Sequence, residues 1–442
     1  MAEEFLRPYQ ANLVGAIRRA FAGARRVLAT LPTGGGKSRV AAATAAAAAA
    51  KGLRVLAVAH RLELVEQLQA ALAAAGLPAA DVYLPGREVE GRPVAVGSVQ
   101  TLSRRAAQGW DLVIIDEAHH AVAETYRPLF EARYVLGLTA TPVRADGRGL
   151  GGVFEAMVNG PTMAELIEAG YLARPRYFTT QGKPWVEAPR GADYDPREID
   201  PLVRRVELEG EVVQAYLDHL QGQTALVFAV TREHGRELGT RFRKAGVEAA
   251  FLDGQTPEVK RAEALARLKD GDLKVVVNVG LFTEGLDVPT VGGVILARPT
   301  ASLGLYLQMA GRALRPAPGK AEAPVIDVTG VNFRRFGPAE GYGAWTLTDG
   351  VVEPQAVRVK GPAAPTQGRQ VTQVQEGSAP LLEVKEEAVD RKRYYFSLLK
   401  LSAHRGYKPG WAAHKFRERF GAFPAWAWLD EYRAQEGGKD AG

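Results

Sequence analysis

The chain of 442 residues contains no cysteine, and its seven histidines are scattered along the sequence. Without cysteine the chain can form neither a disulfide bond nor a cysteine-ligated zinc site, and the spacing of the histidines suggests no metal cluster, so we expect no zinc. Long apolar runs are also absent, because the longest stretch of low polarity, residues 40–50, is too short and too rich in alanine to span a bilayer. The first residues are acidic and include no apolar stretch, so we expect no signal peptide, no association with membranes and a cytoplasmic location.

Charge is in moderate basic excess, with 56 Lys and Arg against 50 Asp and Glu and a net charge of +6. Such an excess suits an anionic partner but does not require one. Its distribution is more informative, because residues 391–428 contain nine Lys or Arg and the single acid Glu418, interleaved with aromatic side chains. Basic residues interleaved with aromatic ones are typical of surfaces that bind single-stranded nucleic acid.

The arrangement of apolar runs indicates the fold class. At this length a chain is expected to fold as about two to three domains. Short apolar runs alternate with helical patterns in two series, which predicts parallel β-α-β units and hence two similar doubly wound α/β domains. The expected strands of the first series are residues 27–31, 54–59, 94–99, 112–115 and 135–138, and those of the second series are 225–229, 249–252, 274–279, 293–297 and 324–328.

The remaining segments indicate how the domains are connected. The two series of expected strands define two domains, residues 1–165 and 206–350. Between them, residues 166–205 include a part that is rich in Pro, Asp and Arg and lacks clear periodicity, so we predict an interdomain linker or insertion there. Residues 351–385 are dense in Pro, Gln, Gly and Thr and are predicted as a second linker. Residues 386–442 are then expected to form a small, mainly helical accessory domain.

The first series begins with a sequence built like a loop that wraps a phosphate group, Leu31-Pro-Thr-Gly-Gly-Gly-Lys-Ser38. Its glycines let backbone N–H groups converge on an anion, Lys37 supplies a positive charge and Ser38 offers a hydroxyl to Mg²⁺. The expected helix over residues 39–50 would point its N-terminus at the phosphates, and its run of alanines would let it pack closely on the sheet. Because Leu31 replaces the first glycine of the strict phosphate-loop pattern, a plain glycine-rich turn stays open as an alternative on the loop alone.

A second chemical signal follows the expected strand over residues 112–115, which ends in Asp116-Glu-Ala-His119. A carboxylate at the carboxyl edge of a parallel strand can hold Mg²⁺ opposite a phosphate loop, and the adjacent Glu117 can orient and deprotonate an attacking water. A solvated helix cap would be the preferred interpretation if the phosphate loop were absent. Together the two segments predict a site that binds and hydrolyses a nucleotide.

With these two segments the chain resembles the superfamily 2 helicases and translocases, whose ATPase core carries a DEAD or DEAH sequence (DEAH box) at this place. Further segments resemble the other motifs of that family in the same order along residues 6–316. They are Arg7–Gln10, Ala59–Arg61, Gly97–Thr101 and Thr139–Pro142 in the first domain, and Val227–Thr231, Thr283–Asp287 and Gln308–Arg315 in the second. The resemblance implies two tandem RecA-like domains with ATP in the cleft between them.

The resemblance also implies which residues hold and hydrolyse ATP. The expected nucleotide contacts are Gln10, Pro32, Thr33, Gly34, Gly35, Gly36, Lys37, Ser38, Gly285 and Asp287, with Ser38 and Asp116 as ligands of Mg²⁺. The expected catalytic residues are Lys37, Asp116, Glu117, Gln308, Arg312 and Arg315. The two arginines come from the second domain. Because a guanidinium group stays charged and forks onto phosphate oxygens, they could stabilise charge on the transferred phosphoryl group.

Other motif residues are expected to contact nucleic acid or to couple the two sites. The expected nucleic-acid contacts are His60, Arg61, Ser98, Gln100, Thr101, Thr231, Arg232 and Thr283, and the expected coupling residues are His119, Thr139 and Thr141. For His60 and Arg61, capping of the following helix stays an equal alternative. No motif supports a role for His120, which is expected to be structural or exposed.

The segment from Gly406 to Gly421, followed by Pro424, resembles the C-terminal end of the RadD-like group of bacterial and phage DNA-repair helicases. Some relatives carry a cysteine-rich zinc module, which this chain cannot form. Helical stretches near residues 391–404 and 409–419 are expected to pack as a pair with basic residues outside. The aromatic residues expected in their core are Trp411, Phe416, Phe420 and Trp426.

We therefore expect a monomeric helicase or translocase, dependent on Mg²⁺ and ATP, that moves along DNA in preference to RNA by cycles of closure between two RecA-like domains. A role in DNA repair or recombination would make repair proteins or single-strand-binding proteins its partners. Three alternatives stay open: a double-stranded DNA translocase or remodeller that separates no strands, an RNA helicase, and a binding module that uses ATP only as a clamp.

Overall fold

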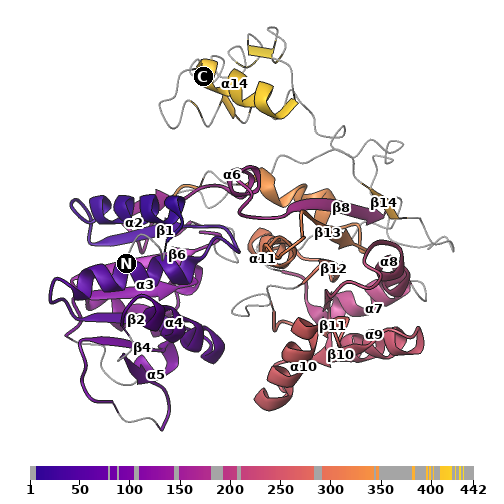
Figure 1. The fold of residues 1–442 in the computed structure, drawn as a ribbon, viewed down its shortest axis with the longest axis horizontal. Helices are drawn as coiled ribbons and strands as arrows, with labels where there is room; N and C mark the ends of the chain where they lie inside the picture. The colour runs from indigo at the N-terminus through magenta and orange to yellow at the C-terminus, as the bar shows by residue number, and fades with distance from the viewer. Residues whose placement is uncertain are drawn as a thin grey trace. The chain divides into compact units, whose positions relative to one another are not determined.

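The structure is a computed structural model that describes most of the chain. The described residues are 6–77, 80–86, 89–103, 109–143, 149–180, 193–206, 211–282, 291–342, 345–347, 381–383, 395–396, 398–399, 402, 409–420, 424, 428–429 and 432. They belong to two compact units, each of which is described by itself. The first unit contains two β-sheets with their helices, and the second contains helix α14 (Pro409–Phe420). Figure 1 labels the elements.

The first sheet forms the first domain and has seven strands in the order β3-β4-β2-β5-β6-β1-β7, with every neighbouring pair parallel. The strands are β1 (Arg26–Thr30), β2 (Val55–Ala59), β3 (Asp81–Tyr83), β4 (Val94–Ser98), β5 (Leu112–Asp116), β6 (Tyr134–Thr139) and β7 (Ala156–Asn159). The helices of this part are α2 (Pro8–Ala20), α3 (Lys37–Ala49), α4 (Leu62–Ala74), α5 (Val99–Leu102), α6 (Met163–Glu168), η1 (Ala118–His120) and η2 (Glu124–Glu131). Because the strands run the same way, the loops that follow them meet at one edge of the sheet.

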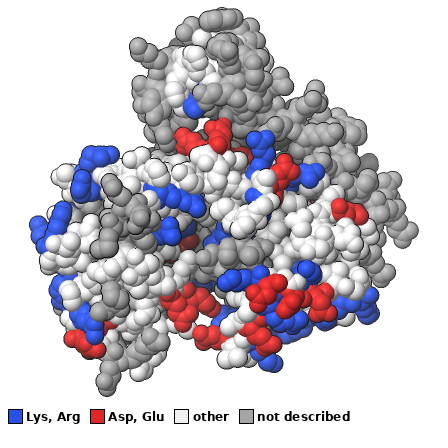
Figure 2. Space-filling view, in the orientation of Figure 1, with Lys and Arg blue, Asp and Glu red and all other residues white. Residues whose placement is uncertain are grey.

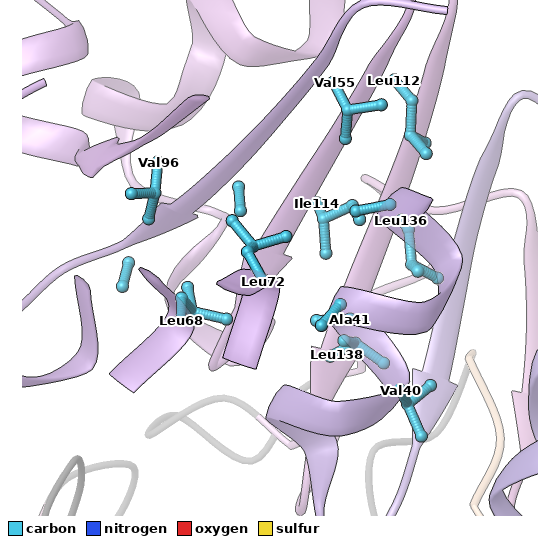
Figure 3. Packing of buried hydrophobic residues seen from close by; sticks show 14 of the residues in the cluster. Val40, Ala41, Val55, Leu68, Leu72, Val96, Leu112, Ile114, Leu136 and Leu138 are labelled. Carbon is cyan, nitrogen blue, oxygen red and sulfur yellow. The ribbon is translucent and has the colours of Figure 1, made fainter. Parts of the chain in front are cut away.

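Helices α3 and α4 pack on this sheet through small and branched side chains (Figure 3). Val40 of α3 and Leu68 of α4 are at most 1% exposed and belong to the same apolar cluster as Ile114 of β5. Burial of a side chain of this size contributes roughly 1.5–3 kcal/mol. The alanines of α3 in that cluster are Ala41, Ala42, Ala45 and Ala48, which confirms that the alanine run allows the helix to pack closely on the sheet.

The second sheet forms the second domain and has the strand order β10-β11-β9-β12-β13-β8-β14. The strands are β8 (Arg174–Thr180), β9 (Ala225–Ala229), β10 (Ala249–Leu252), β11 (Val275–Asn278), β12 (Gly293–Ala297), β13 (Glu322–Asp327) and β14 (Leu381–Glu383). The helices are α7 (Pro196–Val206), α8 (Glu211–His219), α9 (Arg232–Lys244), α10 (Glu258–Asp270), α11 (Leu303–Ala313), α12 (Asn332–Phe336) and η3 (Ala339–Gly341). All its described pairs are parallel except the pair of β14 with β8.

The two doubly wound α/β domains are thus confirmed, and all ten expected strands are present within two residues of their expected bounds. The strands that the sequence did not predict are β3, β7, β8 and β14. β3 and β14 have only three residues each, and β7 is half-buried along its whole length, so neither length nor an apolar run marks them. β8 begins with the polar sequence Arg-Pro-Arg, so no continuous apolar run marks this strand either.

Residues 166–205, predicted as an interdomain linker, instead contribute to the second domain. Their strand β8 pairs with β13, and their helix α7 packs Ile199 and Val203 against Val230. The carboxylate of Asp193 accepts hydrogen bonds of 2.7 and 2.9 Å from the chain that follows β12. Residues 351–385, predicted as a second linker, likewise supply β14 at the edge of the sheet. Both differences arise because β8, α7 and β14 are ordered by distant partners rather than by their own pattern.

Two crossings of the chain between the two domains involve described residues, and the place of β14 in the second sheet requires a third between residues 347 and 381. The first crossing, residues 160–173, joins β7 to β8. After η3 the chain returns to the first domain, where the carbonyl of Trp345 accepts a hydrogen bond from Asn159 (3.1 Å) and that of Leu347 accepts one from the N–H of Gly151 (2.9 Å). Leu347 also packs against the core of the first domain. Residues of both crossings line one cavity of about 20 Å³ beside the phosphate loop, so the crossings lie close together.

The C-terminal unit is built around α14, which confirms the helix expected over residues 409–419. Phe416 is buried with Tyr395, Leu398 and Ala412, and Trp411 packs against this cluster, as expected for an aromatic core. The side chain of Phe420, all of Trp426 and most of the expected helix over 391–404 lie outside the described residues. Within the described part of the chain, no helix combines the length and the apolar character needed to cross a membrane.

Core packing of the second domain gives a first prediction. Ile295 is fully buried in the central strand β12, so Ile295→Ala should lower the free energy of unfolding of this domain by about 2–5 kcal/mol, which urea denaturation would measure. Val259 on α10 is 79% exposed, so Val259→Ala should change that free energy by less than about 0.5 kcal/mol. Equal losses in the two variants would contradict the assignment of β12 to the core.

Candidate active site

The phosphate loop is a tight turn that connects β1 to α3. Gly34 and Gly36 have φ angles of 85° and 87°, a region that glycine adopts without strain. Close contacts also exclude side chains here, because a Cβ added to Gly36 would lie 2.3 Å from Nε2 of Gln10. Since α3 begins at Lys37, the N–H groups of its first turn lie directly after the loop. The loop and the helix N-terminus together form a backbone cradle suited to an anion.

Gln10 reaches this loop from helix α2. Its side chain is 2% exposed, and Nε2 donates a hydrogen bond of 2.9 Å to the carbonyl of Gly35. Its Oε1 accepts a hydrogen bond of 2.9 Å from the N–H of Arg7, which fixes the amide at the start of the helix. The hydroxyl of Tyr9 donates to the same Gly35 carbonyl at 2.9 Å. The expected nucleotide-recognition segment therefore lies directly against the phosphate loop.

Asp116 is the last residue of β5 and Glu117 follows it, and β1 is separated from β5 by β6 alone. Oε1 of Glu117 lies 3.1 Å from Nζ of Lys37, so the expected base and the loop lysine form an ion pair. Asp116 accepts a hydrogen bond of 3.0 Å from the N–H of Glu117. Glu117 has φ 50° and ψ 52° and is the one non-glycine residue with positive φ in the described part of the chain. Such a conformation costs about 1–3 kcal/mol and is typical of functional sites.

Asp116 is held in an environment that favours its neutral form. Burial and the neighbouring carboxylate of Glu117 raise the pKa of Asp116 to about 6, although the ammonium of Lys37 acts in the opposite direction. Two buried carboxylates beside one lysine thus leave negative charge that a further cation would compensate. The hydroxyl of Ser38 and the carboxylate of Asp116 are hard oxygen donors of the kind that Mg²⁺ prefers.

Among the described residues, no group of three or more His, Asp or Glu could hold a metal by itself. This is compatible with Mg²⁺ bound by one carboxylate, one hydroxyl and the oxygens of a nucleotide, since this ion commonly uses few protein ligands and substrate phosphates. The residues present therefore fit a Mg²⁺–triphosphate complex.

The expected coupling residues form a connected group behind Glu117. Nδ1 of His119 lies 3.5 Å from Oε2 of Glu117 and 3.2 Å from the hydroxyl of Thr139. Thr139 is fully buried and donates to the carbonyl of Thr141 at 3.0 Å, while the N–H of Thr141 donates back to the Thr139 hydroxyl at 3.2 Å. The structure thus brings together the segments after β5 and β6.

Helix α11 brings the second domain onto the phosphate loop. A Cβ added to Gly311 would lie 2.8 Å from Cβ of Thr33, so the helix backbone itself is packed on the loop. One helical turn further on, the side chain of Arg315 lies beside Gly34, with its Cγ 3.5 Å from the position of an added Cβ. Gln308 and Arg312 of α11 are both buried. Arg312 is therefore carried on a helix that contacts the loop directly, and Arg315 lies beside the loop two residues after that helix ends.

Comparison with known proteins identifies the family. Residues 4–144 match the family described as the type III restriction enzyme res subunit, and residues 209–317 match the helicase conserved C-terminal domain. A 51.5 kDa protein of a Lactococcus phage (isolate 7-9) is 33% identical over 325 residues, which cover 71% of this chain and 68% of the phage protein. The chain belongs to the superfamily 2 helicases.

A second relative agrees with this family, and a solved structure shares the fold. The helicase is similar to a Saccharomyces cerevisiae protein named as a candidate ATP-dependent helicase, IRC3, with 29% identity over 357 residues, 74% of this chain and 52% of the yeast protein. The chain thus spans about half the length of that relative. A solved fragment of a candidate HsdR subunit of a type I restriction enzyme from Vibrio vulnificus YJ016 shares the fold, with a TM-score of 0.59, 24% identity, and coverage of 76% of this chain and 66% of that one.

The residues of the first domain that are expected to contact nucleic acid lie at or just after the ends of its strands. Arg61, two residues after β2, donates to the carbonyls of Gly280 (3.3 Å) and Leu281 (3.1 Å) in the second domain. Gln100 of α5 donates to the carbonyl of His60 at 3.0 Å. The two expected segments after β2 and β4 are therefore adjacent, and Arg61 contacts the opposite domain.

The hydroxyl residues of the predicted strand contacts also serve as local caps. Ser98 is the N-cap of α5, and its hydroxyl lies 2.9 Å from that of Thr101. Thr231 caps α9 and donates to Asp200 at 2.8 Å, and Arg232 forms an ion pair with Asp253. Thr283, Gly285 and Asp287 lie outside the described residues.

Lys320 supports the site in a way that the sequence did not reveal. Its Nζ donates to the carbonyls of Ala313, Val291 and Arg315, the last at 3.2 Å. These carbonyls lie at the C-terminal end of α11 and at the start of the segment leading into β12, so the ammonium fixes the backbone that carries Arg315. Burial and the Arg315 guanidinium lower the pKa of Lys320 to about 8. The sequence alone could not predict this role, because nothing distinguishes a single lysine after a turn from an ordinary surface lysine.

The raised pKa of Asp116 gives a prediction for stability. Because the pKa rises from 3.8 to about 6, the folded state is destabilised relative to the unfolded state as pH increases through this range. Asp116→Asn should therefore stabilise the protein without nucleotide by about 3 kcal/mol at pH 7.5, and most of this gain should disappear near pH 4. Thermal denaturation at both pH values would measure it. Asp218→Asn, at an exposed position of α8, is the control, and a gain for Asp116→Asn that does not change with pH would contradict the assignment.

Proposed function

We propose that this helicase hydrolyses Mg²⁺-ATP at the phosphate loop and couples hydrolysis to movement along a nucleic-acid strand, with DNA as the substrate. The observation that supports the proposal is the packing of α11 on the loop, with the side chain of Arg315 beside Gly34, because Arg312 and Arg315 of one domain would then act at the nucleotide site of the other. A site divided in this way makes turnover depend on the approach of the two domains.

The residues of the first domain are proposed to bind ATP and activate water. Gln10 would contact the adenine, and the loop with Lys37 would hold the phosphates. Ser38 and Asp116 would hold Mg²⁺, which neutralises phosphate charge when it is bound. A phosphate in the loop would attract the ammonium of Lys37 away from its partner Glu117. The carboxylate of Glu117 would then accept a proton from the water that attacks the terminal phosphorus.

The residues of the second domain are proposed to complete the site when the domains close. Arg312 and Arg315 would donate paired hydrogen bonds to phosphate oxygens on which negative charge develops, while Gln308 faces the same cleft. Asp287 and Gly285 would contact the ribose side of the nucleotide. Such arginines contribute about 10³–10⁵ to turnover in related phosphoryl transfers, which makes closure the step that switches hydrolysis on.

Movement is proposed to arise from alternating grip. The strand contacts on the first domain would be His60, Arg61, Ser98, Gln100 and Thr101, and those on the second domain Thr231, Arg232 and Thr283. His119, Thr139 and Thr141 would transmit the state of the nucleotide site, a role supported by their contacts with Glu117 and with one another. Cycles of closure and opening would then move the protein along one strand.

DNA is proposed as the substrate on two grounds. The first domain matches a restriction-enzyme family, and the basic and aromatic C-terminal segment resembles the RadD-like DNA-repair helicases. Surface charge does not help to choose between DNA and RNA. Figure 2 shows basic and acidic side chains interspersed on the displayed face rather than gathered into one basic patch. A monomer in the cytoplasm, with repair or single-strand-binding proteins as partners, is part of the same proposal.

The assignment of the ATP site is tested by removing one cation from each domain. Lys37→Ala should abolish ATP turnover, since it removes the phosphate-binding charge. Arg315→Ala should lower turnover by about 10³-fold or more while ATP binding persists, as measured by phosphate release and by binding of a fluorescent ATP analogue. Arg267→Ala on α10, where the side chain pairs with Glu248, is the control and should keep both properties. A normal rate of ATP hydrolysis in Arg315→Ala would contradict the assignment of Arg315 to the ATP site.

The substrate is tested by ATPase activity with single-stranded DNA, forked DNA and RNA at several salt concentrations. The motor proposal expects stimulation by DNA, with binding that weakens steeply as salt increases, because phosphate contacts release counterions. Stimulation by RNA alone would overturn the choice of DNA, and a rate indifferent to both would favour the ATP clamp. Strand displacement on forked DNA, measured beside translocation, separates a helicase from a translocase that opens no duplex.

A further inference from the structure

Three histidine rings lie in contact between the two predicted binding sites of the first domain. His60 directly follows β2, while His119 and His120 belong to η1 after β5. The ring centroid of His120 is 4.6 Å from that of His60 and 4.1 Å from that of His119, with interplanar angles of 57° and 42°. His120 therefore lies between the other two rings and contacts both.

Each end of this row reaches residues with a proposed role. On one side, the carbonyl of His60 accepts the hydrogen bond from Gln100, so the ring belongs to the segments expected to contact the strand. On the other side, His119 lies within 3.5 Å of Glu117 and hydrogen bonds to Thr139. The three rings thus form a continuous path of packed side chains from the strand-contacting segments to the proposed base.

The backbone of His120 is tied to the same base. Its N–H donates a hydrogen bond of 3.1 Å to the carbonyl of Glu117, which closes the first turn of η1. Glu117 itself has the left-handed conformation described above, so a small movement of this turn changes the direction of its carboxylate. The ring is half-buried, so a shift of His60 that keeps the rings in contact must displace His120 and, through it, His119.

We propose that His120 is a positioning residue that transmits strand contact at His60 through His119 to Glu117. Resting on the proposed function, this inference adds a residue that lies outside the motif and that the sequence assigned to no role. Strand binding would move the segment after β2, and the stacked rings would pass the movement to η1. The consequence is faster hydrolysis in the presence of nucleic acid, with no direct contact between His120 and either ligand.

The test measures ATPase rates with and without saturating single-stranded DNA, together with DNA affinity by fluorescence anisotropy. His120→Ala should lower the stimulated rate by about tenfold, while the rate without DNA and the DNA affinity stay within about twofold of the original values. His120→Phe keeps a planar ring between the neighbours and should retain most of the stimulation. Adding His60→Ala to His120→Ala should cause little further loss, because both changes break the same path.

His219→Ala is the matched control. This histidine is also half-buried and stacks on an aromatic ring, with its centroid 4.0 Å from that of Phe178 in the second domain. An equal loss of stimulation in this variant would show a general effect of removing a stacked ring and would overturn the inference. Three results for His120→Ala would also overturn the inference. They are normal stimulation by DNA, an ATPase rate without DNA that falls as much as the stimulated rate, and a tenfold loss of DNA affinity. If the unchanged protein is stimulated by no nucleic acid, the proposed function itself fails and the inference with it.

Discussion

The contact between Gly311 and Thr33 is the constraint on which the rest of the site depends. With 2.8 Å between Cβ of Thr33 and the place where a Cβ of residue 311 would lie, only glycine lets α11 approach the phosphate loop this closely. The approach sets the position of Arg312 on α11, and of Arg315 just after it, relative to Lys37 and Glu117. In the proposed function each domain would therefore supply only part of the charge needed around a triphosphate.

The central strands were predictable because strands of a parallel sheet are buried on both faces and appear as continuous apolar runs. The phosphate loop and the carboxylates after β5 were predictable because their residue types follow from the chemistry of phosphate and Mg²⁺. The strand β8 was not, because its order depends on pairing with β13, more than a hundred residues further along the chain. Lys320 and His120 were missed for a related reason, since their contacts are defined by backbone carbonyls and rings that only the folded chain brings together.

Several features of the site oppose stability. Glu117 has a strained backbone conformation, and Asp116 is buried beside a second carboxylate, which raises its pKa. The domain tolerates them because its sheet and the helices around it are densely packed, with the alanines of α3 allowing close contact. Enzyme active sites commonly keep such strained or charged groups, which lower the stability of the free protein, at places where a bound ligand would relieve the strain or compensate the charge.

The paired crossings between the domains have a mechanical consequence. Two rigid bodies joined by one flexible chain can rotate about any axis through the joint, whereas two attachments that lie side by side resist twist and leave one easy rotation. Here the second attachment is fixed by the hydrogen bonds of Trp345 and Leu347 with the first domain. Because residues of both attachments line a cavity beside the phosphate loop, an axis of rotation through them would pass close to that loop. A small rotation about such an axis would move the parts of the domains farthest from the loop by the largest distance.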